Sequence, residues 1–78
     1  MEDRMNVEVR LFATLSRGRF ESRHMVLRSP CTLRQLMEQL GIGEAEAPLR
    51  FVNGRFANLD DALNDRDIVS LFPSVGGG

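Results

Sequence analysis

Residues 32–41 read Thr-Leu-Arg-Gln-Leu-Met-Glu-Gln-Leu-Gly and contain the clearest helical pattern of the chain. The apolar residues follow the i, i+3, i+4, i+7 spacing of one helix face: Leu33, Leu36, Met37 and Leu40. Thr32 with Gln35 three positions later is the pattern of a capping box, and Gly41 suits the left-handed residue that follows a helix. The sequence therefore predicts one amphipathic helix over residues 33–40, with its leucine face in the core.

Short strand-like segments surround this helix. Residues 6–12, Asn-Val-Glu-Val-Arg-Leu-Phe, alternate apolar and polar side chains as a half-buried strand does. Asn53-Gly54 between two apolar runs predicts a two-residue hairpin turn, because both residues tolerate a positive φ. The predicted elements are strands at 6–12, 23–28, 49–52, 55–57 and 68–72, a loop at 14–22, about one turn of helix at 59–64 and a turn at 65–67.

One main helix against one mixed sheet predicts an α+β domain of two layers. An early hairpin, a crossover helix and a last strand that leads into the C-terminus suit a β-grasp, a mixed sheet of four or five strands packed on residues 33–40. In that topology the first and last strands lie parallel and adjacent at the centre of the sheet. We expect a flexible N-terminal extension at 1–4, the domain at 5–73 and a flexible tail at 74–78.

The composition excludes several classes of protein. With 78 residues and a net charge of −1, the chain has one domain and too weak a charge bias for a nucleic-acid partner. A single Cys and a single His predict no disulfide framework and no dedicated metal site. No apolar run approaches the roughly 20 residues that span a bilayer, and the polar N-terminus lacks a signal core, so we expect a cytoplasmic protein with no membrane partner. All ten basic residues are arginines, so the chain has no lysine amine.

The chain ends Ser74-Val75-Gly76-Gly77-Gly78. Three consecutive glycines have nothing to bury and are expensive to order. They are either a disordered terminus without a role, or a flexible linker that presents an unhindered α-carboxylate to a partner. The tail alone favours neither interpretation.

Taken in order, several segments resemble the ubiquitin-like sulfur carriers, which include the small subunit of molybdopterin synthase and the carrier for thiamine thiazole synthesis. The resemblance covers nearly the whole chain. It rests on Val9-Arg10-Leu11-Phe12-Ala13, Val52-Asn53-Gly54, Asp61-Ala62-Leu63, Asp65-Arg66-Asp67-Ile68-Val69 and Phe72-Pro73-Ser74-Val75-Gly76-Gly77-Gly78. It implies a ubiquitin-like β-grasp fold. Leu11-Phe12-Ala13 and Phe72-Pro73 resemble the molybdopterin type more closely.

The resemblance implies a co-substrate, not an enzyme. An E1-like adenylating partner would activate the carboxylate of Gly78 with ATP, and a sulfur donor protein would convert it to a thiocarboxylate. The carrier itself would bind no cofactor. Gly76 and Gly77 would give the backbone clearance in a narrow site, and Pro73 would stiffen the exit from the last strand. Residues 73–78 can extend roughly 20 Å.

The same family implies a larger synthase subunit, or thiazole synthase, as receiving partner. Alternation places Phe12 and Phe72 on the sheet face away from the helix, where aromatic side chains would anchor a partner together with Pro73 and Val75. Either phenylalanine could instead fold back under a loop. We expect Phe51 in the core and leave Phe56 open.

Other polar and reactive residues have simpler interpretations. Cys31 precedes the helix, which could lower its pKa, but a structural role is favoured. We expect His24 to be solvated. The arginines at 17, 19 and 23 could meet an acidic partner surface, but a solvated loop is the default. We expect turn or cap roles for Asp60, Asp61, Asp65 and Asp67.

Two residues depart from the family pattern. Arg66 stands where Gly is frequent, and Ser74 stands where molybdopterin-type tails often have Pro. The sequence leaves three functions open: a sulfur carrier, a ubiquitin-like protein modifier, and a β-grasp binding module with an inert tail.

Overall fold

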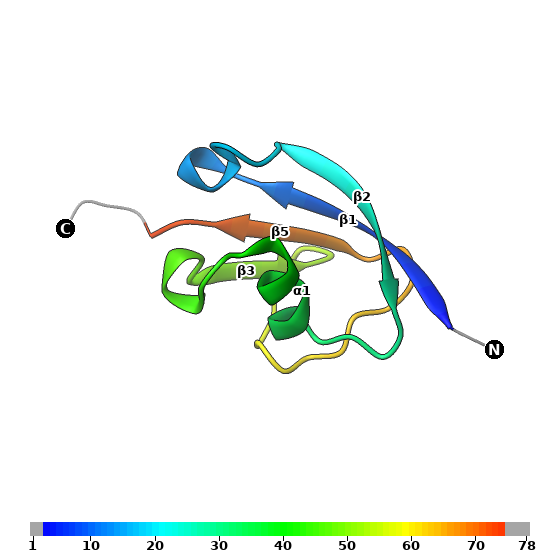
Figure 1. The fold of residues 1–78 in the computed structure, drawn as a ribbon. Helices are drawn as coiled ribbons and strands as arrows, with labels where there is room; N and C mark the ends of the chain where they lie inside the picture. The colour runs from blue at the N-terminus through cyan, green and yellow to red at the C-terminus, as the bar shows by residue number, and fades with distance from the viewer. Residues whose placement is uncertain (1–2, 75–78) are drawn as a thin grey trace.

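The computed structural model describes residues 3–74. A five-stranded mixed sheet has the order β2-β1-β5-β3-β4, and α1 lies across one of its faces (Figure 1). The strands are β1 (Arg4–Leu11), β2 (Ser22–Arg28), β3 (Leu49–Val52), β4 (Arg55–Phe56) and β5 (Ile68–Phe72), and the helices are α1 (Leu33–Leu40) and two short 3₁₀ turns, η1 (Ala13–Ser16) and η2 (Glu44–Glu46). We call the sheet face opposite α1 the outer face.

The first and last strands pair in parallel at the centre of the sheet, as predicted. Val9 lies beside Val69 and Leu11 beside Leu71, while β1–β2, β3–β5 and β3–β4 are antiparallel. This arrangement confirms the ubiquitin-like β-grasp. The first strand begins earlier than predicted, because Arg4, which we placed in the N-terminal extension, pairs with Arg28 in the sheet.

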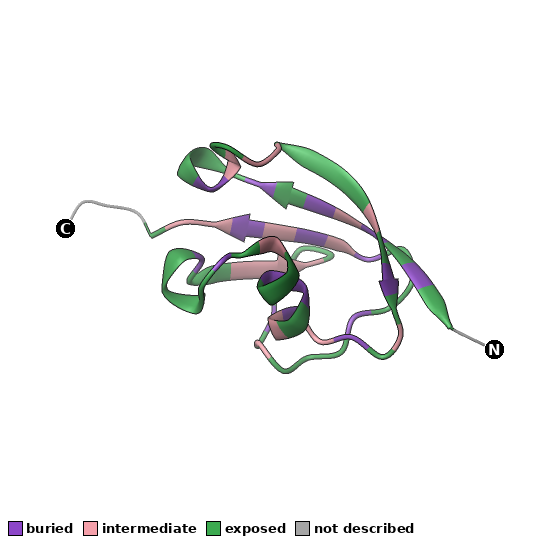
Figure 2. Ribbon diagram, in the orientation of Figure 1, coloured by how far each residue is buried: buried purple, intermediate pink, exposed green. Residues whose placement is uncertain are grey.

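The core lies between the sheet and α1 (Figure 2). Side chains of β1 and β5 that face the helix are almost fully buried: Val7, Val9, Leu11, Val69 and Leu71. Leu33, Leu36 and Met37 face them from α1, as the spacing predicted. The predicted capping box is present, since Thr32 Oγ1 accepts from the Gln35 N–H at 3.2 Å and Gln35 Oε1 accepts from the Thr32 N–H at 2.9 Å. Gly41 ends the helix with a φ of 71°.

The predicted helical turn at 59–64 is wrong. This segment is extended enough to form an isolated bridge between Ala62 and Thr32. The Arg34 N–H donates to the carbonyl of Leu59 at 2.7 Å, and the Leu33 N–H donates to that of Asp61 at 3.0 Å. A helix leaves its first N–H groups without partners, and here the neighbouring segment supplies carbonyls to them instead of forming a helix of its own.

The Asn53-Gly54 hairpin between β3 and β4 is confirmed. Both residues have positive φ, 53° and 83°, as a type I′ turn requires. The Asn53 side chain also holds the turn against β5: its Oδ1 accepts from the Ile68 N–H at 2.9 Å and its Nδ2 donates to Asp67 Oδ1 at 2.8 Å. The second Asp67 oxygen accepts from the Asn64 N–H at 2.7 Å. This buried carboxylate therefore organises the turn before β5.

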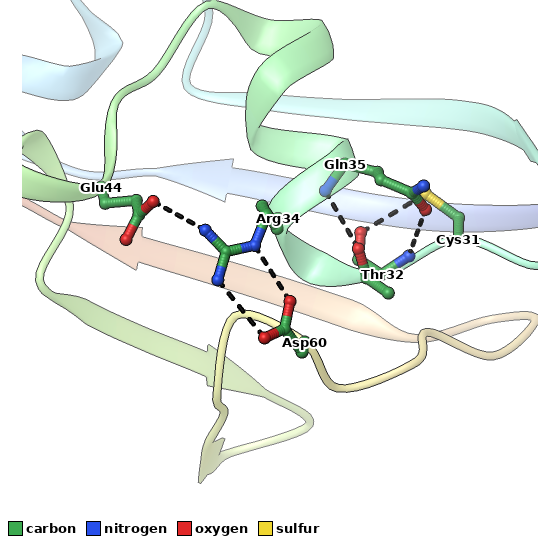
Figure 3. Close-up of polar contacts among 6 residues, drawn as sticks. All are labelled: Cys31, Thr32, Arg34, Gln35, Glu44 and Asp60. Atoms are coloured by element: carbon green, nitrogen blue, oxygen red, sulfur yellow. Dashed lines mark hydrogen bonds and ion pairs between the residues drawn. The ribbon is translucent and has the colours of Figure 1, made fainter.

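Arg34 links α1 to two loops (Figure 3). Its Nε and Nη2 donate to the two carboxylate oxygens of Asp60 at 2.9 and 3.3 Å, and its Nη1 donates to Glu44 Oε2 at 2.7 Å. The hydrogen bonds from Arg34, and then its charge, hold the pKa of the Asp60 carboxyl below its ordinary value. All three side chains are solvent-accessible, so the contact orients the loops more than it stabilises the fold.

Arg66 adopts a φ of +71°, the left-handed region that disfavours a Cβ. Its side chain is 90% exposed, and its Nε lies 3.8 Å from Oδ2 of the adjacent Asp65. We predict that Arg66→Gly raises the free energy of unfolding by about 0.5–1 kcal/mol in urea denaturation. Glycine removes the strain of a Cβ at positive φ, and the extra conformational entropy that glycine loses on folding costs less than that strain. Arg66→Ala is the matched control, and an equal gain from alanine would show that the side chain, not φ, was unfavourable.

Candidate partner-binding face

Phe12 and Phe72 stack directly on each other on the outer face. Their ring centroids are 4.3 Å apart with an interplanar angle of 10°. Phe12 is 38% exposed and Phe72 is half-buried. The contact follows from the central parallel pair, since Leu11 lies beside Leu71 and the Phe12 N–H donates to the Leu71 carbonyl at 3.1 Å. The predicted proximity of the two rings is therefore confirmed.

Two further phenylalanines extend this stack across the sheet. Phe51 meets Phe72 edge-on at 5.7 Å and Phe56 at 6.1 Å. We call the row Phe12–Phe72–Phe51–Phe56 the aromatic strip. Because α1 covers the opposite face, the strip is left partly exposed, and Phe56 is 55% exposed.

The predicted core position of Phe51 is wrong. Phe51 is directly opposite Phe56 in the β3–β4 hairpin and opposite Ser70 of β5, so its ring belongs to the outer face. The two-residue turn fixes the register and places the rings of residues 51 and 56 on the same side, but the pairing of β3 with β5 decides that this side is the outer face. Leu49, which is opposite Phe72 and 39% exposed, also borders the strip and was missed by the sequence interpretation.

The strip lies at the root of the C-terminal tail. Phe72 ends β5, Pro73 is half-buried and Ser74 is exposed. Val75, Gly76, Gly77 and Gly78, to which we assigned the remaining site roles, lie outside the described residues. What the structure establishes is the position of Phe12, Phe72 and Pro73 at the point where the tail begins.

Cys31 has the structural position that the sequence favoured. It is 3% exposed, and burial raises the pKa of its thiol. This direction is opposite to the lowering that a helix N-terminus could produce. The thiol donates to the Thr32 carbonyl at 3.4 Å.

The solvated position predicted for Arg19 is wrong: its side chain is 25% exposed, and its guanidinium donates to the carbonyls of Leu15 and Gly41 at 3.1 and 3.2 Å. His24, Asp61 and Asp65 have the expected positions. The His24 side chain is 80% exposed, with its Nε2 3.7 Å from Glu8 Oε1. Asp61 and Asp65 each accept a backbone N–H, from Asn58 and Asn6 respectively. Among residues 3–74, no group of three or more His, Cys, Asp or Glu side chains could hold a metal ion, and no helix there is long and apolar enough to cross a membrane.

The comparison with protein families decides the classification. The model of the ThiS family matches residues 9–78. The chain belongs to this family of ubiquitin-like sulfur carriers. None of the curated protein sequences compared with it gives a match.

Solved structures agree with this classification. A protein of Pyrococcus furiosus described as 'putative molybdopterin converting factor, subunit 1' is 26% identical, with a TM-score of 0.76 over 91% of this chain and 99% of that one. The complex of subunits 1 and 2 of molybdopterin-converting factor from Helicobacter pylori contains a chain 29% identical, with a TM-score of 0.62 over 95% of this chain and 100% of that one. The small archaeal modifier protein 1 of Haloferax volcanii shares the fold, at 20% identity and a TM-score of 0.75 over 91% of this chain and 99% of that one.

We predict that Phe12 and Phe72 stabilise each other measurably. In a double-mutant cycle of the alanine variants, followed by urea denaturation, the coupling should be about 0.5–1.5 kcal/mol, as for other aromatic pairs. Phe12 and Phe56, which stand at opposite ends of the strip, provide the control cycle and should be additive. Equal coupling in the two cycles would contradict a direct stacking contribution.

Proposed function

We propose that this chain is a sulfur carrier whose Gly78 carboxylate is adenylated and then converted to a thiocarboxylate. An E1-like partner would use ATP to form the acyl-adenylate, with pyrophosphate leaving, and sulfur from a donor protein would then replace AMP. Gly78 has no Cβ to shield its carbonyl from attack, and Gly76 and Gly77 let the backbone approach the nucleotide site. The carrier contributes no catalytic group and binds no cofactor; the ATP is held by its partner.

The observation that carries this proposal is the aromatic strip at the root of the tail. A partner that processes the tail must hold the domain close to residue 72, and exposed aromatic side chains are favoured anchors of interfaces. The stacked pair of Phe12 and Phe72 presents such an anchor at that point. Pro73 and Val75 would extend the contact along the tail.

Molybdopterin (molybdenum or tungsten cofactor) synthesis is the pathway we propose. Two solved structures of similar sequence are subunit 1 of molybdopterin converting factor, and one of them is in complex with subunit 2. By analogy, a larger synthase subunit would receive the tail of this chain. Such a carrier would act in the cytoplasm.

Three other functions are consistent with the fold. Thiazole synthesis would use the same tail chemistry with thiazole synthase as the receiving partner. A protein modifier would instead form isopeptides on lysines of other proteins, since this chain has none of its own. The last alternative, a β-grasp binding module with an inert tail, would tolerate deletion of Gly77 and Gly78.

The proposed chemistry predicts a change in mass. The protein purified from its native host with an unmodified C-terminus should contain a fraction heavier by the exchange of one oxygen for sulfur, in intact-mass spectrometry. Deleting Gly77 and Gly78 together should abolish that fraction without changing the far-UV circular dichroism. A carboxylate that stays free in the presence of the adenylating enzyme, ATP and a sulfur donor would refute the carrier, and conjugates that survive denaturing gels would indicate a modifier.

The docking role of the strip predicts a selective loss of binding. Phe72→Asp should weaken association with the adenylating enzyme at least about tenfold, as truncation of an aromatic anchor does, with an unchanged fold by circular dichroism. Val26→Asp is the matched control, because Val26 is 60% exposed on the same outer face but belongs to the far strand β2. Equal weakening by both variants would show a general effect of charge, and unfolding of Phe72→Asp would assign Phe72 to the stability of the domain.

A further inference from the structure

The strand β2 forms one edge of the sheet and pairs only with β1 among residues 3–74 (Figure 1). At seven residues it is much longer than the opposite edge strand β4, which has two. The backbone bonds at its ends define which groups face β1. The Leu11 N–H donates to the Glu21 carbonyl, and the Ser29 N–H donates to the Asp3 carbonyl, both at 2.9 Å.

Hydrogen-bonded positions alternate along an antiparallel pair. In the register that joins Asp3 to Ser29 and Leu11 to Glu21, the β2 residues that bond to β1 are therefore Arg23, Met25 and Leu27. The N–H and C=O groups of Ser22, His24 and Val26 consequently point away from β1, to the open edge. No strand of the described part of the chain pairs with them. Such a row of peptide groups is a template for another strand.

The charged side chains within β2, Arg23 and Arg28, are both basic, and the strand has no acidic residue. Two carboxylates flank it: Glu21 precedes the strand, and Glu8 of β1 lies opposite His24, with its Oε1 3.7 Å from His24 Nε2. Arg23 lies over the Phe20 ring at 4.2 Å, which holds the guanidinium beside the edge. Val26 is 60% exposed in the middle of the strand, next to a depression of about 210 Å³ that is lined by Arg4, Val26, Leu27 and Arg28.

We propose that the β2 edge binds an extended acidic segment of a partner protein, which adds to the sheet as a sixth strand. The peptide groups of Ser22, His24 and Val26 supply the backbone hydrogen bonds. Alternate side chains of the added strand point to opposite faces, so carboxylates on one face meet Arg23 and an apolar side chain on the other meets Val26.

This edge approaches the aromatic strip at Phe12, which lines the same depression as Ser22. Phe72, Phe51 and Phe56 lie on β5, β3 and β4, beyond β1, so a partner on those three rings does not need β2. A second copy of this chain fits the edge less well, because two paired β2 strands would place four arginines in one sheet without a carboxylate between them. The inference goes beyond the proposed sulfur chemistry and does not depend on it.

The test uses the full chain and a synthetic peptide of alternating valine and glutamate, blocked at both ends. In a ¹⁵N-resolved NMR titration, we expect the amide shifts of Ser22, His24 and Val26 to change more than those of Phe51 and Phe72. A peptide with lysine in place of glutamate is the charge control and should bind at least about tenfold more weakly, since it would place like charges beside Arg23.

Val26→Pro separates backbone pairing from side-chain contact. Its N–H points outward, so proline removes a donor for the added strand while the bonds to β1 remain, and proline is tolerated at such edge positions. The affinity for the acidic peptide should fall at least about tenfold in Val26→Pro and less than about threefold in Val26→Ala. His24→Pro makes the same test if Val26→Pro does not fold.

Four results would overturn the inference. They are shift changes centred on the aromatic strip, equal binding of the lysine peptide, affinity that proline at the edge does not reduce, and no shift changes at the highest soluble peptide concentration. A dimer in sedimentation that Val26→Pro abolishes would assign the edge to self-association instead. None of these results bears on the thiocarboxylate, which is measured by mass.

Discussion

The parallel pairing of β1 with β5 is the constraint on which the rest of the structure depends. These strands are separated by most of the chain, yet Val9 lies beside Val69 and Leu11 beside Leu71, all of them buried. Parallel strands require a crossover between them, and here the crossover contains α1, which covers the valines and leucines of both. The burial of this central pair therefore supports the sheet and its single helix together.

The same pairing determines where the aromatic strip meets the C-terminal tail. Because β1 and β5 run in the same direction, Phe12 and Phe72 come together where β5 ends, and the tail at 74–78 begins two residues later. The proposed anchor for a partner and the base of the proposed reactive terminus are thus produced by one register. A one-residue slip of β5 against β1 would turn the Phe72 ring toward the helix and leave Phe12 on the outer face, so the stacked pair would be lost.

The connection between β4 and β5 shows how polar groups complete the fold. Its carbonyls at Leu59 and Asp61 accept N–H groups from the first turn of α1, and the buried Asp67 joins the hairpin turn to the start of β5. These contacts explain why a segment with helical spacing of Leu59 and Leu63 is not helical. Its carbonyls bond to the first N–H groups of α1, and these non-local hydrogen bonds outweigh the weak helix propensity of the segment.

Local patterns in the sequence determined the helix at 33–40 with both of its caps, the Asn53-Gly54 turn and the alternation that buries Val9 and exposes Phe12, since each depends on residues only a few positions apart. Only the tertiary structure decided that Phe51 joins the aromatic strip, that residues 59–64 cap α1, that Arg66 takes a positive φ and that the outward groups of β2 are left without a strand. Each of these depends on whether a distant segment packs against the residue or hydrogen-bonds to it. The spacing of neighbouring residues does not determine which distant segment that is.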